Sequence, residues 1–182
     1  MKKHLFQVMT ESEQTFEKIA RDIWEHPQVG YEETYASSLQ KDFLSKEGFH
    51  ITTNVGDVET AFVAEWGKGE PIIGFLGEFD ALPGLSQQDQ PTYAPVVEGG
   101  AGHGCGHNLL GTASIEAVVA LKQLMSEQNI TGTIRYYGCP AEELLSGKSY
   151  MARAGVFDDL DVVFAWHPGT FNFTVNASMQ AL

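Results

Sequence analysis

The fold is decided by residues 71–83, which read PIIGFLGEFDALP. A short apolar run, 71–76, is followed at once by acidic residues and then by a proline. Such a run is typical of a strand buried on both faces, whose carboxyl end reaches the sheet edge where sites form. Apolar runs at 132–137 and 161–166 repeat the pattern. The stretch therefore predicts a parallel-type strand within an α/β domain.

Helical patterns alternate with these strands. Apolar spacing predicts helices over 10–25, 34–46, 109–125 and 141–153, and two shorter strands over 51–55 and 60–66. This alternation favours an α/β fold with three α/β/α layers and a mostly parallel sheet. The Gly-, Gln- and Pro-rich residues 84–104 predict a long loop, a feature that is usually functional or mobile in compact domains.

Composition narrows the class of protein. The chain has 182 residues, a formal net charge of −13 and 43% hydrophobic residues, which favours one globular domain. The acidic balance argues against a nucleic-acid surface, and no apolar run approaches the roughly 18–20 residues of a membrane helix. Cys105 and Cys139 are too few for a disulfide scaffold, and the N-terminus lacks a signal-peptide core. We expect a cytoplasmic protein with reduced thiols.

The first candidate metal-binding motif is Cys105-Gly106-His107, within a glycine-rich stretch. In an extended backbone, residues i and i+2 point to the same side, so a thiolate and an imidazole could share one ion. A buried cysteine beside a hydrogen-bonded histidine is the commoner explanation of such a pair. The motif gains weight only from the other clusters in the chain.

A pair of carboxylates, Glu142-Glu143, follows the predicted strand at 132–137 and is expected to open a helix. The helix macrodipole favours acidic residues there, which is the commoner reason for such a pair. In the functional interpretation, one carboxylate binds a cation and its neighbour takes a proton from a cation-bound water. The two interpretations differ in whether other ligands lie nearby.

Two further candidates complete the set. His167 ends the last apolar run, and Asp80 lies just after the strand at 71–76. Asp80 could cap a turn or orient a ligand histidine from behind. All four clusters are expected after strands, at one edge of the sheet. A thiol, imidazoles and carboxylates together suit zinc, manganese or cobalt, whereas calcium and magnesium prefer oxygen ligands alone.

Four motifs occur in order, at 77–87, 102–108, 140–143 and 166–169. Together they resemble the aminoacylase, hippurate hydrolase and carboxypeptidase G family of dinuclear metallopeptidases, and within it the amidohydrolase branch. The resemblance covers roughly residues 12–182 and implies a zinc-peptidase-like catalytic domain. Many relatives carry Asp after the Cys-Gly-His motif, whereas this chain carries the neutral Asn108.

The resemblance also implies the chemistry. It implies two divalent ions, zinc or manganese with cobalt as an alternative, and the implied ligands are Cys105, His107, Glu143 and His167. Glu142 matches the general base, and Asp80 matches the acidic residue that supports the metal site. The implied reaction hydrolyses the amide of an N-acyl or aryl-acyl amino acid, such as a p-aminobenzoyl-glutamate-like or dipeptide-like substrate.

The same resemblance sets expectations for the domain organisation. Family members are considerably longer, so residues 1–182 are expected to be the N-terminal segment of the catalytic domain. The lid and dimerisation domain, the C-terminal catalytic segment and the last histidine ligand would then be absent, and the fragment inactive. The parent is expected to be a homo- or heterodimer that acts on a small molecule, without nucleic-acid or membrane partners.

Two other functions stay open. A non-catalytic metal-binding or interaction module would take up metal without hydrolysis. A cysteine-nucleophile hydrolase would use Cys105 and His107, although a Cys and a His two residues apart rarely align as nucleophile and base. Thiol alkylation would inactivate the latter enzyme, while a chelator would leave it active.

Overall fold

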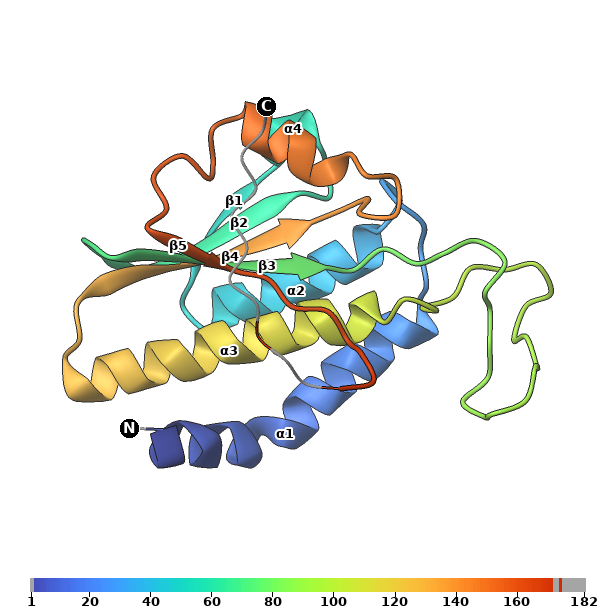
Figure 1. The fold of residues 1–182 in the computed structure, drawn as a ribbon, viewed down its shortest axis with the longest axis horizontal. Coiled ribbons are helices and arrows are strands. Elements are labelled where there is room, and N and C mark those ends of the chain that lie inside the picture. Colours follow the sequence, from blue (N-terminus) through green and yellow to red (C-terminus); the bar gives the residue numbers. More distant parts are fainter. Residues whose placement is uncertain (1, 172–173, 175–182) are drawn as a thin grey trace.

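A mixed five-stranded sheet runs through the computed structural model, which describes residues 2–171 and 174 (Figure 1). The strands are β1 (His50–Thr53), β2 (Phe62–Lys68), β3 (Ile72–Glu78), β4 (Gly132–Cys139) and β5 (Val162–Phe164). Their order is β1-β2-β4-β3-β5. The expected α/β class is confirmed, but parallel pairing is limited to β4-β3-β5. β1 is antiparallel to β2, because the connection between these two strands is too short for a parallel crossover, and β2 is also antiparallel to β4.

Helices cover both faces of the sheet. On one face lie α1 (Lys2–Glu25), α2 (Thr34–Lys46) and α3 (His107–Gln128), and on the other lie α4 (Gly147–Arg153) and the short 3₁₀ helix η1 (Val55–Asp57) (Figure 1). The helix expected at 34–46 is confirmed, while α1 begins earlier than expected and α3 extends beyond its expected limits at both ends. The three-layer arrangement is therefore confirmed.

The helix expected at 141–153 begins only at Gly147. Residues 141–146 form a turn instead, and Ala141 has a left-handed backbone with φ of 51°. The backbone N–H of Ala141 donates to Oε1 of the fully buried Glu33 at 2.7 Å. The left-handed backbones of Ala141 and Leu145, whose φ is 54°, are what keep a helix from running through this segment, and the Glu33 carboxylate satisfies the Ala141 N–H. The acidic pair therefore does not lie at a helix N-terminus.

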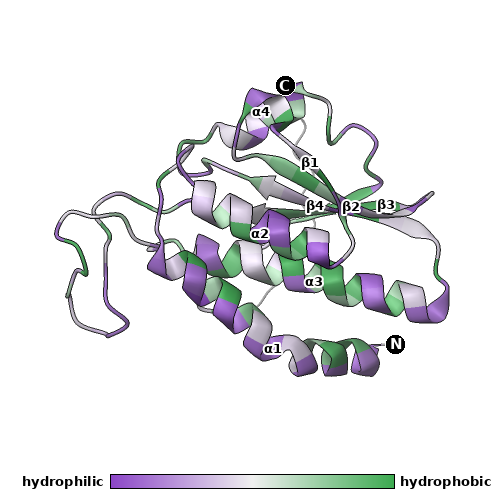
Figure 2. Cartoon of the chain, turned by 180° about the vertical axis from the view of Figure 1, so that it is seen from behind, coloured by the Kyte–Doolittle hydropathy of each residue, from purple (hydrophilic) through white to green (hydrophobic). Residues whose placement is uncertain are grey.

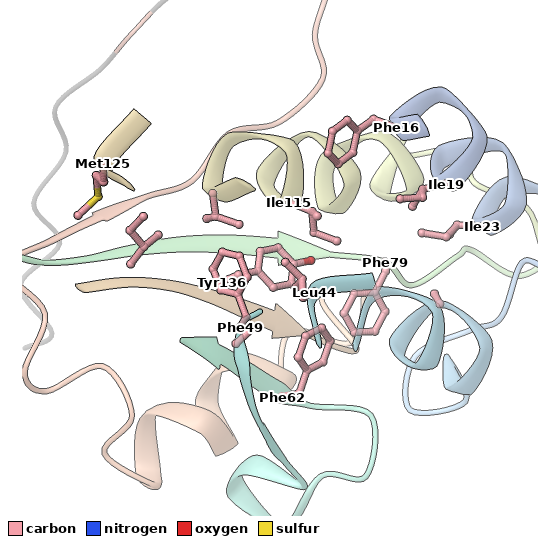
Figure 3. Close-up of a cluster of buried hydrophobic side chains, with 14 residues drawn as sticks. Phe16, Ile19, Ile23, Leu44, Phe49, Phe62, Phe79, Ile115, Met125 and Tyr136 are labelled. Carbon is pink, nitrogen blue, oxygen red and sulfur yellow. The ribbon is translucent and has the colours of Figure 1, made fainter. Parts of the chain in front are cut away.

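The main core lies between α1, α2 and α3 and the sheet (Figure 3). The side chains labelled there are Phe16, Ile19, Ile23, Leu44, Phe49, Phe62, Phe79, Ile115, Met125 and Tyr136. A smaller core lies beneath α4, where Tyr137 packs on Phe157 with ring centroids 4.8 Å apart. Burial on both faces of β3 and β4 fixes the strand ends that carry the site.

One helix, α3, is long and apolar enough to cross a membrane by length and composition, contrary to the sequence-based expectation. Its most apolar window has a mean hydropathy of 1.2, and half of that window is buried. α3 packs against α1 and β3, so its position in the core accounts for its apolar character. Around α1, in contrast, polar and apolar residues alternate (Figure 2).

The long loop expected at 84–104 is present and extends away from the body of the protein (Figure 1). Its own hydrogen bonds give it shape, because the side chain of Gln87 donates to Thr92 O at 2.7 Å and accepts from Ala94 N–H at 3.0 Å. Apolar and polar residues also alternate over 171–175, which predicts the start of a further element, and residues 172, 173 and 175 of it lie outside the described residues.

Candidate metal centre

The candidate metal centre lies where β3 and β4 end and α3 begins. Glu78 is the last residue of β3, and the buried Asp80 follows two residues later. His107 is the first residue of α3 and is fully buried. The clusters expected at one sheet edge do meet there. The expectation that each follows a strand is wrong for 105–107, which enters α3 from the long loop.

One nitrogen of the His107 ring is hydrogen-bonded to a neighbouring residue and the other is not. Its Nδ1–H donates to Asp80, at 2.9 Å to Oδ1 and 3.1 Å to the backbone oxygen. Its Nε2 is buried without a hydrogen-bond partner among the described residues. Three carboxylate oxygens face Nε2, from Glu78 at 3.3 Å, Glu142 at 3.7 Å and Glu143 at 3.9 Å. A nitrogen lone pair facing carboxylates is repulsive unless a proton or a metal ion lies between them.

The pKa of His107 reflects the same surroundings. Burial lowers this pKa, but the hydrogen bond that the ring donates to Asp80 and the negative charges of Asp80, Glu78 and Glu143 outweigh burial and raise it overall. The cluster therefore attracts positive charge to Nε2. Asp80 has a second partner, because its Oδ2 accepts the backbone N–H of Glu143 at 2.9 Å. One buried carboxylate thus holds both the imidazole and the turn that carries the acidic pair.

Cys105 lies at the end of the long loop, two residues before His107, and also contributes to the centre. Gly106 has a φ of 84°, so the segment is not extended as expected, and the chain turns into α3 at this point. Cys105 Sγ lies 3.2 Å from Nε2 of the exposed His167. The indole N–H of Trp166 donates to Leu110 O at 3.1 Å, which fastens the histidine segment to the start of α3.

The protonation state of Cys105 bears on the nucleophile alternative. Burial, together with a hydrogen bond and negative charge from Glu143, raises the pKa of this thiol to about 11. Nucleophilic cysteines have lowered pKa values instead, so this environment opposes a cysteine-nucleophile hydrolase. A bound metal ion reverses this preference, because a coordinating thiol is deprotonated.

Two groups of donor atoms can each surround a cation, with all atoms of a group within 4.8 Å of one another. The groups are Cys105, His107 and His167, and Glu78, His107 and Glu142. His107 Nε2 and Glu143 Oε1 are buried without hydrogen-bond partners among the described residues, as expected of metal ligands. Mixed sulfur, nitrogen and oxygen donors fit zinc or a related divalent ion.

The sequence analysis included Glu78 in the acidic cluster after the strand at 71–76 without giving it a role, and it missed Lys148 and Glu33. Lys148, from α4, forms an ion pair with Glu78 Oε1. Burial lowers the pKa of Lys148, but the hydrogen bond to Glu78 and the surrounding negative charges, Glu142 among them, together outweigh burial and raise it. Glu33 shapes the 141–146 turn, and burial raises its pKa. Glu78 had a sequence signal, since it stands two residues before Asp80, whereas the other two had none.

Two polar residues near the centre, Asn108 and His103, belong to neither group of donor atoms. The side-chain amide of Asn108 donates to Ala20 O at 3.2 Å, in α1, so it holds two helices together. His103 lies beside a cavity of about 760 Å³ beneath the long loop, with Trp24, Pro27 and Leu85 also in its wall. Burial lowers the pKa of His103 to about 4, so this imidazole is neutral at physiological pH.

The fold and the metal centre define the class of protein. Residues 74–177 match the model of peptidase family M20/M25/M40, and the chain belongs to this family. The family resemblance inferred from the four motifs is thereby confirmed.

Two curated relatives are informative. One is a p-aminobenzoyl-glutamate hydrolase of Escherichia coli K12, in which the matching chain is one of the subunits; the identity is 47% over 175 residues and 92% of this chain. The other is the hippurate hydrolase of Campylobacter jejuni, with 34% identity over 84% of this chain. These matches cover 36% and 39% of the relatives, so the chain spans little more than a third of their length.

Solved structures agree with this assignment. The YXEP protein of Bacillus subtilis, described as a dinuclear metal-binding peptidase of the M20 family, matches with a TM-score of 0.74 and 29% identity. That match covers 86% of this chain and 43% of the other. An aminobenzoyl-glutamate utilization protein from Klebsiella pneumoniae shares the fold, with a TM-score of 0.68 at 20% identity.

Proposed function

We propose that this chain is part of a metal-dependent hydrolase that cleaves the amide bond of an N-acyl or aryl-acyl amino acid. The single observation that carries the proposal is the unpartnered, fully buried Nε2 of His107, which faces three carboxylates. That arrangement is repulsive unless Nε2 carries a proton or binds a metal ion, and the second unpartnered atom beside it, Oε1 of Glu143, favours the metal ion. The names of the relatives, a p-aminobenzoyl-glutamate hydrolase and a hippurate hydrolase, favour an aryl-acyl substrate.

The proposed metal ligands are Cys105, His107, Glu143 and His167. They would hold two divalent ions, zinc or manganese with cobalt as an alternative, in agreement with the dinuclear relative. When bound, such ions lower the pKa of a water molecule and polarise the substrate carbonyl. Asp80 supports the centre by keeping the proton of His107 on Nδ1, which leaves Nε2 free to bind metal.

Glu142 is the proposed general base. Its side chain is 31% exposed, so a water and a substrate can reach it, while its Oε2 lies only 3.7 Å from His107 Nε2. In this role the carboxylate takes a proton from the attacking water and returns it to the leaving amine. Glu143, the neighbouring residue, is held by its backbone N–H on Asp80, so the two carboxylates have different tasks.

The organisation of the whole protein is also a proposal. We infer that residues 1–182 are the N-terminal segment of a catalytic domain, because they span little more than a third of the curated relatives. The lid, the remaining ligand and the dimer contacts would then lie elsewhere, and these residues alone would turn over slowly or not at all. Both cysteines are free, which is consistent with a cytoplasmic protein.

The experiment is metal analysis combined with an activity assay. The chain is purified without added metal, reloaded with zinc or manganese, and analysed for metal per chain before hippurate and p-aminobenzoyl-glutamate are offered. We expect uptake of one or two ions and metal-dependent hydrolysis below roughly 1 s⁻¹. The Cys105→Ala and His167→Ala variants should lose metal. Glu142→Gln should keep its metal and lose hydrolysis.

The other outcomes separate the alternatives. Uptake of metal without any hydrolysis fits an inactive segment as well as a non-catalytic module, and a stable oligomer in addition would favour the module. Hydrolysis at an ordinary enzymatic rate would show that the segment is active alone. Absence of metal uptake, or uptake that Cys105→Ala and His167→Ala leave unchanged, would overturn the proposed centre.

A further inference from the structure

The structure assigns a further metal ligand, Glu78, and a residue that positions it, Lys148. This inference rests on the metal centre of the proposed function and adds a ligand outside the set given above. Glu78 is the last residue of β3 and lies within the motif at 77–87, whereas Lys148 comes from the short helix α4, on the face of the sheet opposite to α3, and lies in none of the four motifs. Their side chains meet at the edge of the centre.

Glu78 has the geometry of a ligand. Its side chain is only 12% exposed, and its Oε2 lies 3.3 Å from His107 Nε2. This is the shortest of the three carboxylate distances to that nitrogen, ahead of Glu142 and Glu143. Because Nε2 is fully buried and unpartnered, a cation placed there must contact the nearest carboxylate as well.

The donor groups also need Glu78 if two ions are bound. His107 belongs to both groups, but an imidazole nitrogen has one lone pair and binds one ion. If His107 joins Cys105 and His167 around the first ion, the second group loses its nitrogen; Glu142 is the proposed general base, so Glu78 is the carboxylate of that group that is left to bind the second ion. Glu78 then supplies the second ion with a carboxylate that is less exposed than Glu142.

Lys148 gives the two carboxylate oxygens of Glu78 different partners. Its ammonium group pairs with Oε1, and Oε2 is the oxygen that faces His107. A carboxylate held in this way at one oxygen presents the other in a fixed direction, which is how outer residues orient metal ligands. The charge of Lys148 also offsets part of the repulsion between Glu78 and its acidic neighbours.

The test is a titration of metal-free protein with zinc and, separately, manganese, followed by calorimetry. We expect Glu78→Gln to bind one ion fewer or to bind roughly 10–100-fold more weakly, and Lys148→Met to weaken binding about tenfold. The double variant should be no weaker than Glu78→Gln alone, because Lys148 acts only through that carboxylate. Lys148→Arg, which keeps the charge, should restore part of the loss.

Matched controls come from an ion pair of the same kind outside the centre. Lys122, also partly buried, pairs with Glu47 at 3.4 Å. Lys122→Met and Glu47→Gln should therefore leave both metal affinity and the number of bound ions unchanged. They also measure what the loss of a half-buried ion pair does to folding, followed by circular dichroism.

Each of the remaining outcomes would overturn a stated part of the inference. If Cys105→Ala loses metal while Glu78→Gln binds like the unaltered protein, the assignment of Glu78 is overturned and the proposed function stands. If the unaltered protein binds no metal, both are overturned. If Lys148→Met binds metal more tightly, or still weakens binding in the Glu78→Gln background, Lys148 does not act by positioning Glu78.

Discussion

Two clusters of charged side chains, around His107 and around Arg135, differ in how completely they are paired. The Arg135 guanidinium donates to Glu65 at 2.6 Å and to both oxygens of Asp159 at 2.6 and 2.9 Å. These hydrogen bonds raise the pKa of Arg135 and close the cluster on itself. The His107 cluster instead directs carboxylate oxygens from three residues at a nitrogen with no partner among the described residues.

The Arg135 cluster is a set of ion pairs that stabilises the fold, whereas the His107 cluster has the unsatisfied polar atoms of a ligand-binding site. A bidentate arginine–carboxylate pair satisfies its donors and acceptors within the chain. A buried nitrogen and carboxylates without such partners keep their capacity for a cation, at a cost to the stability of the metal-free protein. The three predictions below test the contrast in order of expected effect.

The largest effect is expected from His107→Gln, which removes the central ligand. Zinc at about 1,000 times its dissociation constant should stabilise the unaltered protein by about 4 kcal/mol, or roughly 10 °C in Tm for a chain of this size. His107→Gln should lose most of that shift, as should a chelator. Thermal unfolding followed by circular dichroism measures it. An equal zinc shift in both proteins would contradict the contrast.

A smaller effect is expected from Asp80→Asn. The carboxylate of Asp80 accepts from both His107 Nδ1–H and the Glu143 backbone N–H, whereas an amide oxygen can replace only one of these acceptors. We expect the metal-free protein to lose about 1–3 kcal/mol in unfolding free energy, and zinc affinity to fall roughly 10–100-fold. Urea unfolding and zinc titration measure the two effects.

The control for that variant is Asp161→Asn, because Asp161 accepts a backbone N–H from Ile72 at 2.7 Å outside the centre. This change should cost stability without altering zinc affinity. If both variants weaken zinc binding equally, Asp80 acts on the fold in general and not on the centre.

The smallest effect concerns pH and the Arg135 cluster. The hydrogen bonds and charge of Arg135 lower the pKa of Asp159, so this ion pair contributes stability above the ordinary aspartate pKa of about 3.9 and loses it as the pH falls through the lowered value. Asp159 is largely exposed, so the contribution is below about 1 kcal/mol.

Asp159→Asn should accordingly be slightly less stable than the unaltered protein at pH 7, and the gap should shrink below about pH 4. Urea unfolding at both pH values measures it. At each pH, the zinc affinity of Asp159→Asn should equal that of the unaltered protein. A gap that widens in acid would show that Asp159 is not held in its ionised form by Arg135.

The sequence predicted the parts of the fold that local patterns specify. The apolar period defined the helix at 34–46, and the apolar runs located β3, β4 and β5. The sequence also predicted that Cys105, His167 and the acidic pair lie at one edge of the sheet. These are short-range signals, or follow from the rule that the ends of parallel strands meet.

The errors arose where distant residues override local preference. The 141–146 segment was predicted as a helix, but Ala141 and Leu145 have left-handed backbones, and distant carboxylates of Glu33 and Asp80 hold the resulting turn through the N–H groups of Ala141 and Glu143. Lys148 carries no local sign that its partner is Glu78. Long-range hydrogen bonds of this kind are visible only once the chain is folded.

Gly111 determines how closely α3 approaches β3 at the metal centre, although it offers no donor atom. It lies one turn after His107 in α3, and a methyl group there would come within 2.5 Å of Glu78 O and 2.8 Å of Gln40 Nε2. The helix that carries the imidazole can therefore approach the strand that carries the carboxylate only because this position is bare. A survey of such proteins by ligand chemistry alone would overlook the residue, and an alanine there would disable the centre by widening it.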